Sequence, residues 1–96
     1  MSKYIMLLNW TEQGIKSIKD SASRYDAAKA SASGMGIAFE AVYMTFGQYD
    51  QLIIVDAPSD EALAAFILKV TALGNVRGTT LKAFDEQQYR QITAAV

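Results

Sequence analysis

Hydrophobic positions along the chain follow two periods, and each period marks a different kind of element. Residues Lys3 to Trp10 are apolar on both faces of an alternating pattern, which is typical of a strand covered on both sides. Strand formers recur at 37–46 and 52–55, and the glycine-containing loop Gly47–Asp50 between them predicts a hairpin. A last strand is predicted over Val76–Phe84.

Helical stripes occupy the intervals between these strands. Thr11 offers an N-cap for a first helix, which we expect to end at Gly34 because glycine adopts the left-handed conformation easily. Its apolar stripe consists of Ile15, Ile18, Ala22, Tyr25, Ala28 and Ala32. The charged residues of its other face, Arg24 among them, are expected to lie in solvent.

A second helix is predicted from Ser59, its N-cap, to Gly74, because acidic residues fill its first turn. Its apolar stripe consists of Leu63, Phe66, Val70 and Leu73. After the last strand, Asp85 and Gln88 have the spacing of a capping box, which predicts a short C-terminal helix.

The element order β-α-β-β-α-β predicts a ferredoxin-like α+β fold over residues 1–96 as a single domain. In this fold both helices cover one face of a four-stranded antiparallel sheet, and the first and third strands are central. These are also the two most apolar strands of the sequence, at Lys3–Trp10 and Leu52–Val55. Such strands leave apolar side chains on the face of the sheet that has no helices.

The composition of the chain indicates how that apolar face is covered. The chain has 96 residues, of which 51% are hydrophobic, and it contains neither cysteine nor histidine. A domain of this size is marginally stable, and neither a disulfide nor a zinc site is available to stabilise it. We therefore expect a homodimer in which two sheets pack face to face, as in a dimeric α/β barrel.

Charge and hydropathy exclude several classes of partner. The net charge is −1 with dispersed cationic residues, so we expect neither nucleic acid nor an anionic membrane surface as a partner. No apolar run approaches the length of a membrane span, and the chain leads directly into a strand instead of a signal peptide. A cytoplasmic protein is the expectation.

The missing residue types also exclude much chemistry. Without histidine or cysteine there is no Ser-His-Asp triad, no cysteine nucleophile, no histidine-bound haem and no nitrogen or sulfur metal site. We expect no cofactor. The Gly34-Met35-Gly36 segment resembles a phosphate-binding loop, but it follows a helix where such loops precede one, so we interpret it as a helix end.

Six residues remain as candidates for ligand binding. Tyr49 and Asp50 of the hairpin loop could orient a polar ligand, with Asp50 as a base, although a turn also explains Asp50 and its neighbouring glycine. The other four lie on strands and could line an apolar cleft, or serve as core and interface residues: Asn9, Trp10, Tyr43 and Arg77. Catalytic residues are not identified.

Several short segments together resemble the GYD-domain family. They are Thr11-Glu12-Gln13-Gly14, Gly47-Gln48-Tyr49-Asp50, Ala57-Pro58 and Leu73-Gly74-Asn75-Val76-Arg77. The resemblance covers almost the whole chain and implies a dimeric α/β barrel of bacterial or archaeal origin. It implies no particular function, because the family is largely uncharacterised and fold analogy is a weak guide to activity.

Two functional hypotheses follow. The first is a homodimeric module that binds or senses a small apolar or aromatic molecule. The second is a cofactor-independent enzyme, of the monooxygenase or isomerase type, that acts on a small aromatic substrate. The sequence does not decide between them or name the ligand.

Overall fold

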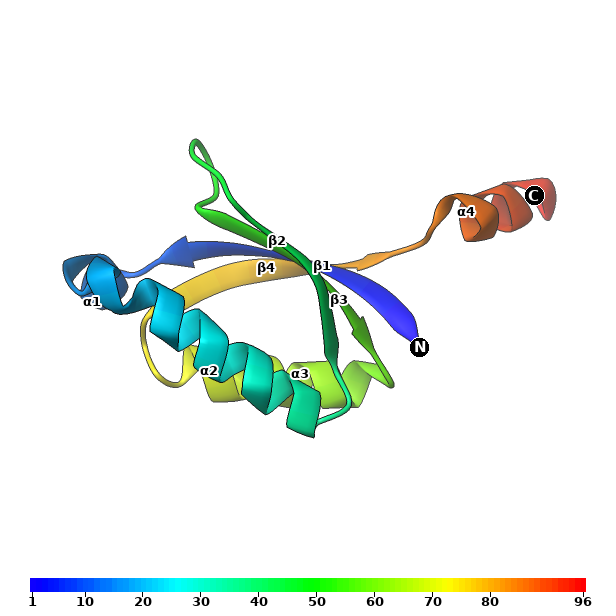
Figure 1. Cartoon of the computed structure of the whole chain (residues 1–96). Helices are drawn as coiled ribbons and strands as arrows, with labels where there is room; N and C mark the ends of the chain where they lie inside the picture. Colours follow the sequence, from blue (N-terminus) through cyan, green and yellow to red (C-terminus); the bar gives the residue numbers. More distant parts are fainter.

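The computed structural model describes residues 1–96 and has the predicted order of strands and helices (Figure 1). The elements are β1 (Ser2–Trp10), α1 (Glu12–Lys16), η1 (Ile18–Asp20), α2 (Ser21–Gly34), β2 (Ala38–Met44), β3 (Gln51–Ala57), α3 (Asp60–Thr71), β4 (Val76–Ala83) and α4 (Glu86–Ala94). None of the helices is long and apolar enough to cross a bilayer.

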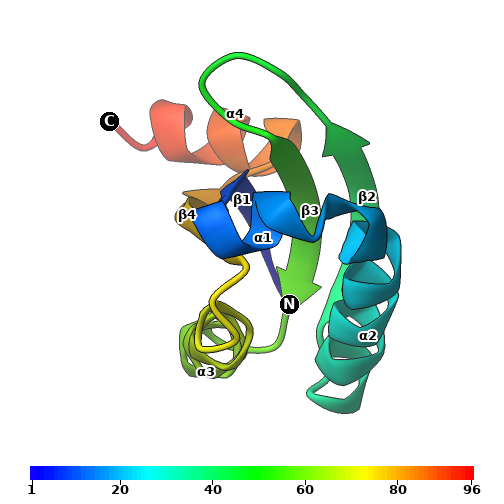
Figure 2. The same ribbon diagram turned by 90° about the vertical axis from the view of Figure 1, so that its left-hand side faces the viewer.

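The strands form one antiparallel sheet in the order β2-β3-β1-β4. The two most apolar strands are therefore central, as predicted. Helices α2 and α3 both lie on one side of this sheet, whereas the β2–β3 hairpin and α4 extend on the other side (Figures 1 and 2). The ferredoxin-like α+β prediction is confirmed for the single chain.

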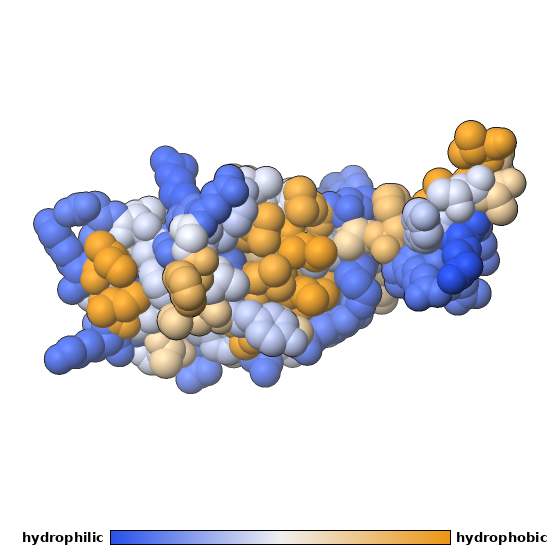
Figure 3. Space-filling model, turned by 90° about the horizontal axis from the view of Figure 1, so that it is seen from above, coloured by the Kyte–Doolittle hydropathy of each residue, from blue (hydrophilic) through white to orange (hydrophobic).

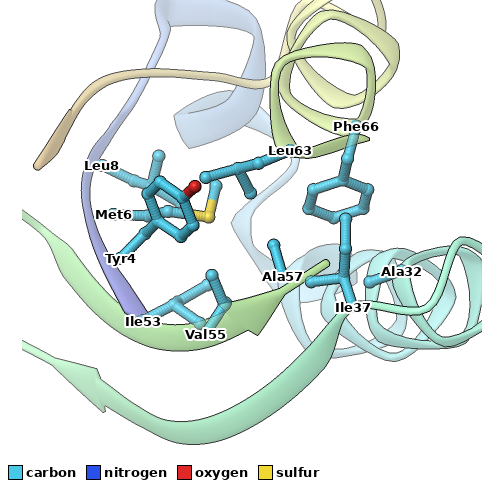
Figure 4. Close-up of a cluster of buried hydrophobic side chains, with 10 residues drawn as sticks. All are labelled: Tyr4, Met6, Leu8, Ala32, Ile37, Ile53, Val55, Ala57, Leu63 and Phe66. Carbon is cyan, nitrogen blue, oxygen red and sulfur yellow. The ribbon is translucent and has the colours of Figure 1, made fainter. Parts of the chain in front are cut away.

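The core lies between the sheet and the two helices (Figure 4). Alternate residues of β1 and β3 point toward the helices because successive side chains of a strand face opposite sides. The ten core residues are Tyr4, Met6, Leu8, Ala32, Ile37, Ile53, Val55, Ala57, Leu63 and Phe66. The stripe predicted for the second helix thus supplies two core residues, both from α3.

The first predicted helix is not continuous, which corrects the sequence interpretation. It breaks at Ser17 into the short helix α1 and the longer helix α2, with a 3-10 turn between them. Residues Ile15 and Ile18, expected on the buried stripe, are exposed. The break has a physical cause at the start of α1, which is attached to the loop before β4.

Three contacts attach α1 to that loop. The Thr11 amide donates to the Asn75 carbonyl oxygen at 3.0 Å, and the Thr11 hydroxyl donates to the Gly74 carbonyl oxygen at 2.5 Å. Gly14 approaches Asn75 so closely that a Cβ atom would collide with its carbonyl oxygen. Because α1 is directed by these contacts, the chain must turn at Ser17 before α2 can pack along the sheet.

The end of α2 also differs from the prediction. Gly34 is the last helical residue, and the left-handed residue is Gly36, with φ of 77°. The Gly36 amide donates to Ser33 and the Ile37 amide donates to Ala32, which satisfies carbonyl groups of the last turn. Positive φ angles also occur at Gly47, with 112°, and at Gly74, with 84°.

The face of the sheet away from the helices is open. Its centre is apolar, as the space-filling view from that side shows (Figure 3). Strand alternation and register assign the apolar centre to Ile5, Leu7, Leu52, Ile54 and Leu81. Helix α4 has a capping box at Asp85, as predicted, but it buries none of its residues.

A polar cluster links α3 to the sheet on the helix side. The Tyr4 hydroxyl donates to the Asp60 carboxylate, and the Lys82 ammonium lies 3.2 Å from the same carboxylate. These bonds, that of Tyr4 first, lower the pKa of Asp60, whereas the bond to Asp60 and burial raise the pKa of Tyr4. The cluster orients the first turn of α3.

The substitution Asp60→Asn tests this cluster. Since the pKa of Asp60 is lowered by folding, its carboxylate adds stability above the ordinary aspartate pKa of about 4 and loses it as the pH falls. The variant should therefore unfold at lower temperature near neutral pH, and the deficit should shrink in acid. Circular dichroism melts between about pH 2.5 and pH 7 measure it.

Asp26→Asn is the matched control, because Asp26 is exposed and has no hydrogen bond or ion pair. This variant should melt like the wild type at every pH. A deficit in Asp60→Asn that does not change with pH would contradict the assignment.

Candidate functional site

A cavity of about 230 Å³ lies between the helix side of the sheet and helices α2 and α3. It is lined by 18 residues, 12 of them hydrophobic, so its walls are mainly apolar. Strands β1, β2 and β3 supply its floor with Met6, Leu8, Trp10, Phe39, Gln51 and Ile53. Helix α3 supplies one wall with Phe66, Lys69, Val70 and Leu73.

Helix α2 forms the opposite wall with two alanines between polar residues. Residues Arg24, Ala27, Ala28 and Ser31 all line the cavity, and their spacing places them on one side of the helix. The alanines leave space that larger side chains would fill. The break between α1 and α2 sets this side of α2 toward the sheet, so the local geometry that the sequence did not predict shapes the cavity.

Arg24 is half-buried and is held by backbone oxygens. Its Nη1 donates to the Ser17 carbonyl oxygen at 2.9 Å, and its Nη2 donates to the Gly14 carbonyl oxygen at 3.2 Å. These carbonyls belong to the C-terminal end of α1, where a cation is favourable. The expectation that Arg24 lies in solvent is wrong. The helix break leaves carbonyl groups at the end of α1 without a partner in the helix, and the Arg24 guanidinium donates hydrogen bonds to them.

Ser31 carries the only buried side-chain polar atom without a hydrogen-bond partner. Its hydroxyl oxygen belongs to a residue that lines the cavity. Buried hydroxyl groups in folded proteins are almost always paired. A buried hydroxyl group without a partner, on a residue of the cavity lining, is therefore the feature of this molecule that most directly suggests a ligand contact.

Trp10 is the only one of the six predicted site residues that lines the cavity. It also lines a second, more open depression together with Ile18 and Val42. Trp10 is thus shared by the two hollows, at the end of β1.

Tyr49 and Asp50 of the hairpin loop lie outside the cavity lining. The Asp50 carboxylate accepts a hydrogen bond from the Trp10 amide at 3.0 Å, and the Asp50 amide donates to the Leu8 carbonyl oxygen. The Tyr49 carbonyl oxygen accepts from the Thr45 hydroxyl at 2.6 Å. These bonds connect the hairpin loop to the end of β1.

The remaining three predicted residues lie on the open face of the sheet. Register pairs Asn9 with Arg77, and strand alternation places both on the side away from the helices. Tyr43 lies on the same side and is 60% exposed. None of the three lines the cavity, so the structure separates them from Trp10.

Two charged residues on the edge strands β2 and β4 have partners within the chain. Glu40 accepts hydrogen bonds from Lys3, which also lies 3.9 Å from Asp56, and Lys82 pairs with Asp60 as described above. No group of three or more aspartate or glutamate residues is arranged to hold a metal ion.

The sequence interpretation missed Arg24 and Ser31 as site residues. A signal for them exists, because the segment that forms α2 is rich in alanine and serine, and the small residues Ala27 and Ala28 lie between Arg24 and Ser31. Recognising it as a cavity wall requires knowing which side of α2 faces the sheet. The break at Ser17 determines that side.

The fold and cavity define a small ferredoxin-like α+β domain with an apolar pocket between its sheet and its helices. The chain belongs to the GYD-domain family, since the sequence profile of the GYD domain matches residues 4–93. The resemblance inferred from the sequence motifs is confirmed.

Comparison with solved structures supports the fold alone. The chain is similar to a structure described as "crystal structure of FFRP-DM1", with a TM-score of 0.61 and 16% sequence identity. The alignment covers 88% of this chain and 100% of the other. No curated protein sequence matches this chain.

The Asp50 contact predicts a structural role that substitution can measure. Asp50→Ala should lower the free energy of unfolding by about 1 to 2 kcal/mol, because it leaves the Trp10 amide without its partner. Asp50→Asn retains an acceptor oxygen and should cost less than half of that amount. Urea denaturation followed by Trp10 fluorescence gives both values.

Gln48→Ala serves as the control, because Gln48 is an exposed residue of the same loop whose side chain makes no hydrogen bond. It should leave stability unchanged. Equal losses in Asp50→Ala and Gln48→Ala would show that the Asp50 contact contributes nothing specific.

Proposed function

We propose that this protein is a homodimeric module that binds a small, mostly apolar molecule in the cavity between its sheet and its helices. The observation that carries the proposal is the cavity itself, whose walls are mainly hydrophobic and include a few polar groups. Ligand sites in proteins have this composition, in which apolar walls supply affinity and sparse polar groups supply orientation.

The volume limits the size of the ligand. An engineered apolar cavity of about 150 Å³ is large enough to bind benzene. A cavity of about 230 Å³ therefore has room for one aromatic ring with substituents or for a small bicyclic ring system. The aromatic residues Trp10, Tyr25 and Phe39 line it and offer ring faces to such a molecule.

The position of Asp50 favours a binding module over an enzyme that converts a substrate. A base must reach the substrate by a hydrogen bond or through one water. Asp50 does not line the cavity, and its carboxylate already accepts from the Trp10 amide. The two residues with shifted pKa values, Tyr4 and Asp60, also lie outside the cavity lining.

The open face of the sheet supports the homodimer. Its apolar centre includes Leu81, which is 46% exposed in the single chain. Contiguous apolar surface of this kind marks protein interfaces in small proteins. A second copy placed face to face would bury it, and Asn9, Tyr43 and Arg77 on the same face would then lie at or beside the interface.

Filling the cavity should weaken ligand binding without unfolding the protein. Ala28→Leu adds three carbon atoms to the cavity wall, so it should weaken binding of the neutral aromatic 2-naphthol at least about tenfold. Titration followed by amide chemical shifts measures the affinity, and in the wild type the shifts should cluster around the cavity.

Ala30→Leu is the matched control, because Ala30 is an exposed residue of the same helix that does not line the cavity. It should bind 2-naphthol like the wild type. If 2-naphthol and similar small aromatics cause no shifts at the cavity of the wild type, the binding function is wrong.

A charge on the open face should prevent dimerisation. The wild type should scatter light with the mass of two chains at micromolar concentration, and Leu81→Arg should weaken the dimer at least about a hundredfold because it places a charge in an apolar interface. Leu68→Arg on α3 is the control, since Leu68 is 69% exposed and lies on the helix side. A wild-type mass of one chain would refute the dimer.

A further inference from the structure

We propose that the cavity binds an amphipathic anion, namely a small aromatic or aliphatic carboxylate with a second polar atom at its far end. This inference rests on the binding function proposed above and specifies the chemistry of the ligand. Three features of the cavity support it: the sign of its charges, the donors of Arg24 and the hydroxyl group of Ser31.

The first feature is the charge of the lining. Arg24 and Lys69 are the charged residues that line the cavity, and both are cations. Neither lies within 4.0 Å of a carboxylate of the chain. Arg24 is half-buried beside apolar walls and lacks part of its hydration, so an anionic ligand gains more from it than it would in water, whereas Lys69 is exposed and adds a weaker attraction.

The second feature is the set of donors that Arg24 leaves available. A guanidinium has five N–H donors, and three hydrogen bonds to Ser17 and Gly14 use both Nη1–H groups and one Nη2–H group. Nε makes no hydrogen bond within the chain and Nη2 makes one of the two that it can make; in a guanidinium, Nε–H and the neighbouring Nη2–H form one edge of the planar group. Two parallel donors on one edge match the two oxygens of a carboxylate.

The bonds to α1 also hold this edge in position. A side chain that is already fixed by backbone carbonyl groups loses little rotamer freedom when it binds a ligand. Arg24 is therefore prepared for a carboxylate. Lys69, from α3 on the other side of the cavity, makes no hydrogen bond within the chain and can add a second positive charge.

The third feature is the unpaired hydroxyl group of Ser31. Seven residues separate Arg24 from Ser31, which places both on the same side of α2 and about 10 Å apart along its axis. The alanine wall lies between them. A ligand with its carboxylate at Arg24 and an apolar body along the alanines would place a polar atom at its far end near the Ser31 hydroxyl.

Two matched naphthalene compounds test whether the cavity prefers an anionic ligand. Naphthalene-2-carboxylate and naphthalene-2-carboxamide have the same ring and nearly the same shape, but only the first is an anion. The carboxylate should bind the wild-type protein at least about tenfold more tightly, because hydrogen bonds to charged groups are the stronger ones. Calorimetric titration at low salt measures both affinities.

Charge-neutralising variants identify the residues responsible. Lys69→Gln and Arg24→Gln should each reduce the preference for the carboxylate several-fold, and the double variant should abolish it. Lys29→Gln is the control, because Lys29 is an exposed residue of α2 that does not line the cavity. Lys69→Gln removes no contact within the chain, so it remains informative if Arg24→Gln destabilises α1.

A third probe tests Ser31 separately. The compound 6-hydroxynaphthalene-2-carboxylate carries a hydroxyl group at the far end of the ring and should bind about fivefold more tightly than naphthalene-2-carboxylate. Ser31→Ala should remove that advantage and leave the affinity for naphthalene-2-carboxylate unchanged. The melting temperature of the ligand-free variant should not fall, because the substitution removes an unpaired hydroxyl group.

The outcomes separate the two proposals. If the carboxamide binds as tightly as the carboxylate, the anionic ligand is refuted while the binding function stands. A preference that survives the double variant would refute the roles of Arg24 and Lys69, and an advantage of the hydroxyl group that survives Ser31→Ala would refute the role of Ser31. If no probe binds at all, the binding function itself fails.

Discussion

The structure depends on one constraint: the sheet has two apolar faces, and the chain has only enough helix to cover one. Helices α2 and α3 bury the face formed by Tyr4, Met6 and Leu8, and the ten residues of that core are all that the domain encloses. The other face stays open within the single chain (Figure 3). The face-to-face dimer proposed above would cover this face, and the hairpin and α4 extend toward the same side (Figure 1).

Because the chain has so little helix, the cavity on the helix side of the sheet is also left unfilled. Helices α2 and α3 make few contacts with each other, and α2 presents alanines to the space between them. Attachment of α1 to the loop at Asn75 redirects the chain at Ser17 and brings Arg24 to the cavity wall. One local event, the helix break, therefore contributes both to the shape of the cavity and to the charge of its lining.

Periodicity and capping residues predicted most of the fold because these signals are local. The strands, their order in the sheet, the cap at Ser59 and the capping box at Asp85 all agree with the structure. The helix break was missed because its cause is a contact between Gly14 and Asn75, which are far apart in the sequence. For the same reason the candidate site was only partly predicted: Trp10 lines the cavity, whereas Arg24 and Ser31 were not recognised.

By itself the sequence determined the family, the α+β fold and the excess of apolar surface, since each depends on residue types and their spacing along the chain. Only the tertiary structure decided which side of α2 faces the sheet, that Asp50 is bonded to the Trp10 amide, and that Asn9, Tyr43 and Arg77 lie apart from the cavity. A binding site is made of side chains brought together from distant segments, and local sequence patterns do not encode those distances.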